Sequence, residues 1–175
     1  MIKKVELSML KKILAVFFLI MVFPALLHAG VIGKAAPGFT LDGLDGKAVS
    51  LEKFKGTVVF LDFWASWCPP CKKEMPEIAR LAEKFSSSDL SIVAVSVDKK
   101  KEHAKAFIST VPGASNSLIV LHDPEASVVS AYRAQAMPTS FIIDRAGVIR
   151  FVHFGYREND PVEWVKEIES LLKGK

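Results

Sequence analysis

Cysteine is scarce in this sequence, at two of 175 residues. A small domain held together by many disulfides is therefore excluded, and a hydrophobic core must stabilise the fold. Internal repeats and low-complexity stretches are also missing, while half of the residues are hydrophobic. That composition excludes a disordered chain and a collagen-like one. The length suits a single domain of roughly 150 residues behind a short leader.

An excess of charge of one sign is missing from most of the chain. The formal charge is +4, but the first 29 residues contain four lysines and one glutamate. Without them, 19 basic and 18 acidic side chains remain. A nearly neutral body does not indicate a phosphate-binding surface, so we expect no nucleic-acid partner.

Residues 1–29 have the pattern of an export signal. Lys11 and Lys12 precede an apolar run of fifteen residues, Ile13–Leu27, and the small residue Ala29 follows. This pattern is typical of a secretory signal peptide, and the run is shorter than the ~20 residues that cross a bilayer as a helix. We expect cleavage after Ala29, with an uncleaved membrane anchor as the alternative. The mature domain would then comprise residues 30–175 and lie outside the cytoplasm, in the periplasm or its equivalent.

Hydrophobic periodicity predicts alternating strands and helices in residues 30–175. An N-terminal hairpin that turns at Asp45-Gly46 comes first. Near-continuous apolar runs predict strands at 57–63, 91–97, 118–121, 139–143 and 148–154. Apolar stripes at helical spacing predict helices at 69–85, 100–111 and 124–132, and a last helix that begins at residue 160. This order favours an α/β fold with a central mixed sheet flanked by helices.

Both cysteines lie in one motif, Trp67-Cys68-Pro69-Pro70-Cys71, where a buried strand leads into a helix. Positions i and i+3 of a first helical turn have Cβ atoms about 5–6 Å apart, which is close to disulfide geometry. Pro69 and Pro70 suit that turn, because its N–H groups have no partner within the helix. Cys68 would lie at the helix N-terminus, where the dipole favours a thiolate. We therefore predict that Cys68 attacks and that Cys71 resolves the mixed disulfide.

Other uses of a cysteine pair fit less well. A structural disulfide usually joins distant segments, whereas this loop is too short to constrain much of the unfolded chain. A zinc site requires four ligands, and the sequence has no second cysteine pair and no H-x-x-x-H, so we expect no metal. Haem attachment requires a histidine directly after the second cysteine, where this chain has Lys72.

The sequence resembles the thioredoxin superfamily, and more narrowly the exported TlpA/ResA-type thiol–disulfide oxidoreductases. The matching segments are 59–76, which reads VFLDFWASWCPPCKKEMP, and 137–141, which reads MPTSF. The resemblance extends from about Gly33 to Leu172. It implies a thioredoxin-like fold with an inserted αβ segment between Val97 and Leu121. It also implies a redox-active disulfide in place of any cofactor, and proteins with thiols or disulfides as substrates.

The resemblance further implies roles around the cysteine pair. Pro138 matches the family's cis-proline, and the backbone of Met137 would pair with an extended substrate. Asp62 and Glu74 align with acids that take up the proton of the resolving cysteine, and which of the two does so stays open. The remaining substrate surface is expected at Trp67, Pro69 and Pro70.

These features favour an exported, monomeric oxidoreductase that reduces protein disulfides and is recharged by a membrane or periplasmic redox partner. The resemblance places such proteins in cytochrome c maturation. One alternative is a thiol peroxidase, which is disfavoured because Ala65 lies where the peroxidatic motif has Thr or Ser and because the C-x-x-C is present. The other is a non-enzymatic thioredoxin-like binding module with a static disulfide.

Overall fold

The computed structural model describes residues 30–86 and 89–174. Within them, one sheet has the strand order β2-β1-β5-β4-β3-β6-β7. The central strands β3, β4 and β5 are parallel, and β6, β7, β1 and β2 join them in antiparallel pairs. The predicted mixed sheet and the N-terminal hairpin, formed by β1 and β2, are confirmed. The predicted signal segment, residues 1–29, lies outside the described residues.

The strands are β1 (Thr40–Gly43), β2 (Ala48–Ser50), β3 (Val58–Trp64), β4 (Leu90–Ser96), β5 (Ile119–His122), β6 (Thr139–Ile143) and β7 (Ile149–Phe154). The helices are η1 (Leu51–Phe54), α2 (Pro69–Lys84), α3 (Lys101–Ile108), α4 (Ala114–Ser117), α5 (Ser127–Ala131) and α6 (Asp160–Lys173). In the part of the chain that the structure describes, no helix combines the length and the apolar character needed to cross a membrane.

Two helices are shorter than predicted. The helix expected at 100–111 ends at Ile108, and Gly113, at a left-handed φ of 78°, turns the chain into the separate helix α4. The helix expected at 124–132 begins only at Ser127, because the carboxylate of Asp123 accepts hydrogen bonds from the backbone of Ser127 and Val128. Helices of four or five residues are too short to produce a periodic pattern in the sequence.

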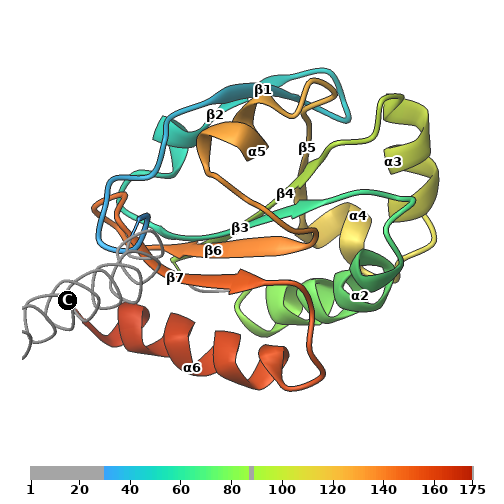
Figure 1. Ribbon diagram of the computed structural model, residues 1–175. Coiled ribbons are helices and arrows are strands. Elements are labelled where there is room, and N and C mark those ends of the chain that lie inside the picture. The colour runs from blue at the N-terminus through green and yellow to red at the C-terminus, as the bar shows by residue number, and fades with distance from the viewer. Residues whose placement is uncertain (1–29, 87–88, 175) are drawn as a thin grey trace, which may run out of the picture. The chain divides into compact units, whose positions relative to one another are not determined.

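The sheet separates two layers of the core (Figure 1). Figure 1 shows α2 and α6 below the sheet and α5 above it. Alternate residues of β3 face the two layers: Phe60 packs on Trp164 of α6 with ring centroids 5.2 Å apart, whereas Phe63 packs on Tyr132 after α5 at 5.4 Å. Asp62 lies between these two phenylalanines in alternation with Phe60, so it faces the layer of α2 and α6.

Strand β3 positions the site. All seven of its residues are buried, because β4 and β6 pair with it on both sides and helices cover both faces. This explains the near-continuous apolar run of its sequence. Its carboxyl end leads through residues 65–68 directly into α2.

Candidate active site

The cysteine pair lies at the first turn of α2. Cys68 is the N-cap, with an extended backbone, and its Sγ accepts a hydrogen bond from the backbone N of Cys71 at 3.3 Å. The two Cα atoms are 5.3 Å apart and the sulfurs form a disulfide. Pro69 and Pro70 occupy the first two helical positions, where a missing N–H leaves no helical hydrogen bond unmade. Cys68 is 4% exposed and Cys71 is fully buried, so a substrate meets Cys68 first.

A second segment, just before the neighbouring strand β6, reaches the disulfide. The Met137–Pro138 peptide bond is cis, and the carbonyl oxygen of Met137 lies 3.7 Å from Cys68 Sγ. Pro138 is buried and comes directly before β6, which pairs with β3. The pairing of these two strands therefore brings the Met-Pro segment to the cysteines, although 69 residues separate them in the chain.

The surface around Cys68 is apolar and accessible. Trp67 is 64% exposed, which is unusual for a tryptophan, and Pro69 and Pro70 are exposed as well. Trp64 differs from Trp67, because it is buried and packs on Phe107 with ring centroids 5.4 Å apart. Trp67 is thus available for contact with another molecule, whereas Trp64 is part of the core.

Two buried acids lie in the core layer of α2 and α6. Asp62 is fully buried and Glu74, one turn after Cys71, is 1% exposed. Neither carboxyl oxygen of Asp62, nor Oε2 of Glu74, has a hydrogen-bond partner in the described part of the chain. Burial raises the pKa of Asp62 from 3.8 to about 8. Burial, followed by the nearby charges of Asp62 and Asp160, raises the pKa of Glu74 from 4.5 to about 10.

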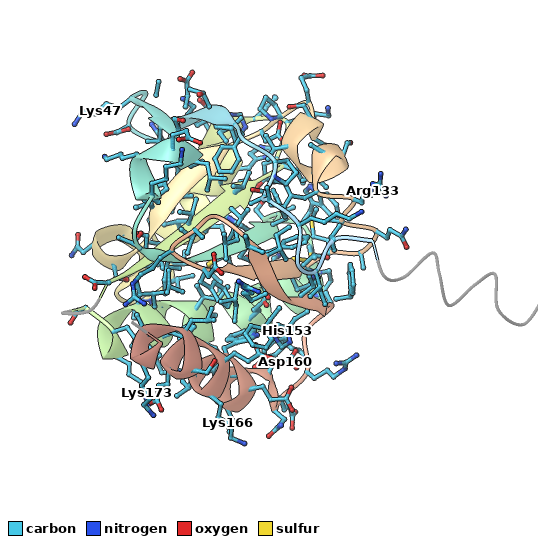
Figure 2. The ribbon with its side chains drawn as sticks, turned by 90° about the vertical axis from the view of Figure 1, so that its left-hand side faces the viewer. Lys47, Arg133, His153, Asp160, Lys166 and Lys173 are labelled. Carbon is cyan, nitrogen blue, oxygen red and sulfur yellow. A yellow bond between two sulfur atoms is a disulfide. The ribbon has the colours of Figure 1, made fainter. Side chains whose placement is uncertain are left out.

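A cluster of possible metal ligands lies between β7 and the start of α6. Figure 2 labels His153 and Asp160 side by side, and ligand atoms of His153, Asp160 and Glu163 lie within 4.8 Å of one another. Protein contacts already engage two of them: His153 Nε2 lies 2.7 Å from Glu167 Oε2, and Asp160 Oδ2 accepts a hydrogen bond from the backbone N of Arg157 at 2.7 Å. We therefore assign no metal to this cluster.

The sequence analysis missed two residues that bear on the site. Asp160 begins α6, and its charge contributes to the raised pKa of Glu74. Asp98 is a fully buried residue just after β4, and its carboxylate accepts hydrogen bonds from Ser66. The sequence could have pointed to Asp98, because it follows a buried strand. The carboxyl ends of neighbouring parallel strands meet at one edge of a sheet, so Asp98 could be expected near the end of β3.

Sequence comparison places the chain among thiol-active proteins. The model of the AhpC/TSA family matches residues 32–152. The thiol-disulfide oxidoreductase ResA of Bacillus thuringiensis subsp. konkukian is 35% identical over 138 residues, which are 78% of this chain and 78% of that protein. ResA of Bacillus subtilis is 38% identical over 117 residues, which are 67% of this chain and 64% of that protein.

Similar solved structures are also thiol-disulfide proteins with a thioredoxin-like fold. A candidate thiol:disulfide interchange protein DsbE from Chlorobium tepidum superposes with a TM-score of 0.75 at 37% identity, covering 81% of this chain and 97% of that one. The exposed lipoprotein thioredoxin Etrx1 of Streptococcus pneumoniae superposes with a TM-score of 0.65 at 29% identity, covering 77% and 100%. The predicted thioredoxin-like fold and the predicted resemblance to ResA-type proteins are confirmed.

Proposed function

Because this chain belongs to the AhpC/TSA family of thioredoxin-like proteins and is a thiol-disulfide oxidoreductase of the ResA type, we propose that it reduces disulfides in protein substrates through Cys68 and Cys71. One observation carries the proposal. The pair spans the first turn of α2, with the Cys68 sulfur at the helix N-terminus beneath an accessible apolar surface and Cys71 fully buried behind it.

The two cysteines take different steps. In the reduced protein the Cys68 thiolate attacks one sulfur of the substrate disulfide, forms a mixed disulfide and releases the other substrate sulfur as a thiolate. Cys71 then loses its proton and attacks Cys68 Sγ. The mixed disulfide breaks, the second substrate sulfur leaves and takes up a proton, and the protein is left with its Cys68–Cys71 disulfide. The free N–H groups at the start of α2 stabilise the attacking thiolate.

Asp62 and Glu74 handle the proton of Cys71 in this scheme. A carboxylate with an ordinary pKa near 4 is a poor base for a thiol, whose own pKa is about 8.5. Burial raises the pKa of both acids towards the range of the thiol, which makes proton exchange between them more nearly balanced. Only the ionised form of either acid can accept this proton, and which of the two does so stays open.

The substrate binds across the exposed side of Cys68. Trp67, Pro69 and Pro70 provide apolar contact there, and Met137 offers its backbone to an extended segment of the substrate beside Pro138. An open surface of this kind suits a protein substrate. The cysteines supply the redox chemistry, and the protein requires no other cofactor.

The cellular setting follows from the leader. Residues 1–29 have the pattern of an export signal, so the domain works outside the cytoplasm, in the periplasm or its equivalent. In an oxidising compartment a reductant must be recharged, which requires a membrane or periplasmic redox partner. Cytochrome c maturation, in which cysteines are kept reduced for haem attachment, is the setting we favour, with the protein acting as a monomer.

Single-cysteine variants test the assignment, because the chain has no other thiol. With a disulfide-containing protein substrate, we expect C68S to lose activity and C71S to accumulate a mixed disulfide, visible as a shifted band on a non-reducing gel. Full turnover by C68S would refute the roles. Rapid peroxide consumption by the reduced wild type, without any disulfide substrate, would favour the thiol peroxidase alternative, although the buried Ala65 offers no hydroxyl for it.

A further inference from the structure

A buried aspartate holds the loop that leads from β3 to Cys68. Asp98 follows β4 and has no exposed surface. Its Oδ2 accepts a hydrogen bond from the backbone N of Ser66 at 3.0 Å, and its Oδ1 accepts one from Ser66 Oγ at 2.7 Å. One carboxylate therefore fixes both the backbone and the side chain of the residue two positions before Cys68.

Asp98 is itself anchored to the sheet. Ser96 Oγ donates to Asp98 Oδ2 at 2.8 Å and accepts a hydrogen bond from Asp98 N at 3.1 Å. His122 Nε2, at the end of β5, lies 2.7 Å from the carbonyl oxygen of Asp98. Val97 N donates to the carbonyl oxygen of Trp64 at 3.0 Å, which joins the carboxyl ends of β3 and β4. The carboxylate thus belongs to the rigid edge of the sheet, and the loop is held to that edge.

From Ser66 the constraint continues to the sulfur. Cys68 N donates to the carbonyl oxygen of Ala65 at 3.1 Å, so residues 65–68 form a tight turn around Ser66. At the end of this turn Cys68 Sγ receives the hydrogen bond from Cys71 N. The helix terminus stabilises a thiolate only while the sulfur stays close to these N–H groups, because the effect falls off within the first turn.

We propose that Asp98 is a positioning residue for the redox reaction: acting through Ser66, it holds the turn before Cys68 so that the Cys68 sulfur stays at the N-terminus of α2. The inference rests on the proposed attack by Cys68. It goes beyond that role because it identifies the residue that keeps the Cys68 sulfur in place. This residue follows β4, whereas Cys68 follows β3.

The sign of the effect separates positioning from simple electrostatics. A negative charge near a thiol disfavours the thiolate, so if Asp98 acted by its charge alone, removing the charge would lower the pKa of Cys68. If Asp98 acts by positioning, removing it frees the turn and raises the pKa of Cys68 towards the 8.5 of an unperturbed thiol. The two mechanisms therefore predict shifts in opposite directions.

The experiment measures the alkylation rate of Cys68 by iodoacetamide against pH in the full chain, reduced beforehand, with mass spectrometry to identify the labelled cysteine. We expect Asp98→Ala to raise the thiol pKa by about one unit, for example from about 7 to about 8, which lowers alkylation at pH 7 about fivefold. Asp98→Asn retains one acceptor for Ser66 and should shift the pKa in the same direction by less. Ser66→Ala removes only the hydroxyl donor and should also give the smaller shift.

A matched control is Asp144→Ala. Asp144 also accepts two backbone hydrogen bonds in a loop, from Ala146 N and Val148 N at 2.9 Å each, but it lies at the opposite end of β6 from Pro138. It should lower the melting temperature without moving the pKa of Cys68. If Asp98→Ala does not fold, Asp98→Asn and Ser66→Ala carry the test. An unchanged or lowered pKa in these folded variants overturns the inference, whereas a wild-type Cys68 pKa near 8.5 overturns the proposed attack by Cys68 before any variant is made.

Discussion

Replacing Glu74 with glutamine should stabilise the oxidised protein, and the gain should grow as the pH rises. Glu74 is 1% exposed, and its Oε2 is buried without a hydrogen-bond partner among the described residues. Burial is the main reason that its pKa is raised from 4.5 to about 10, and the charges of Asp62 and Asp160 add to it. Glutamine has nearly the same shape but cannot ionise. The substitution therefore removes the free energy that the native state loses because Glu74 ionises in the unfolded chain and stays protonated when buried.

The sign follows from the proton balance. Above pH 4.5 the unfolded chain ionises Glu74, while the native state keeps the proton up to about pH 10. The native state therefore holds more protons in this interval, so the free energy of unfolding falls as the pH rises through it. One proton is worth about 1.4 kcal/mol per pH unit, which gives about 4 kcal/mol between pH 5 and pH 8. Water entry and local relaxation reduce this figure, so we expect about 2–4 kcal/mol.

The assay is urea unfolding of the wild type and E74Q at pH 5, 6.5 and 8 without reductant, so that the disulfide stays intact. The matched control is E83Q, on the same helix but exposed, which should change the free energy of unfolding by less than about 0.5 kcal/mol at every pH. The free energy of unfolding of E74Q must exceed that of the wild type by an amount that increases with pH. If this difference increases by less than about 1 kcal/mol between pH 5 and pH 8, Glu74 ionises in the native protein and the reasoning fails.

Two further predictions follow from the same site. Asp160→Asn removes one of the charges that raise the pKa of Glu74 but keeps an oxygen for Arg157 N, so Glu74 of the native variant should ionise at a lower pH than in the wild type, and its free energy of unfolding should stop falling at a lower pH. Urea unfolding at several pH values between 5 and 10 checks this, and curves that level off at the same pH in both proteins would contradict it. Trp67→Ala should change the free energy of unfolding by less than about 0.5 kcal/mol, because the side chain is 64% exposed, while KM for a protein substrate rises. Steady-state kinetics with a protein disulfide and a small aromatic disulfide check this, and an equal loss for both substrates would exclude a role in binding proteins.

The central part of the fold could be predicted because its signals are local. The apolar run of β3 and the stripe of α2 each specify their own structure, and the C-x-x-C between them needs only the geometry of one helical turn. Residues 65–71 therefore carry enough information for the disulfide. Pro138 could be placed beside the cysteines only through the family resemblance, because the pairing of β6 with β3 that brings it there is not encoded in any short segment.

The importance of Asp98 and Asp160 could not be predicted from the sequence. Each is an acidic residue at the end of a strand or the start of a helix, where aspartate is common for reasons of solubility and capping. Their importance depends on which elements become neighbours: Asp98 matters because β4 pairs with β3, and Asp160 because α6 lies in the same layer as α2. Short helices such as α4 were missed for a related reason, since tertiary contacts rather than periodicity define them.

The buried acids are hard to explain by stability. Asp62 and Glu74 share one layer of the core, and Ser140, which pairs with Asp62 across the sheet, also has a buried hydroxyl without a partner in the described part of the chain. Polar groups buried in this way destabilise a fold, and apolar residues of similar size would pack there at lower cost. This loss of stability has an explanation if the two acids act while Cys68 and Cys71 are reduced. The thiol of Cys71 must then lose a proton in a site that water reaches poorly, and only a carboxyl whose pKa is raised towards that of a thiol can exchange a proton with it readily. In the proposed reaction, the burial that weakens the native state would thus fit these acids for the resolving step.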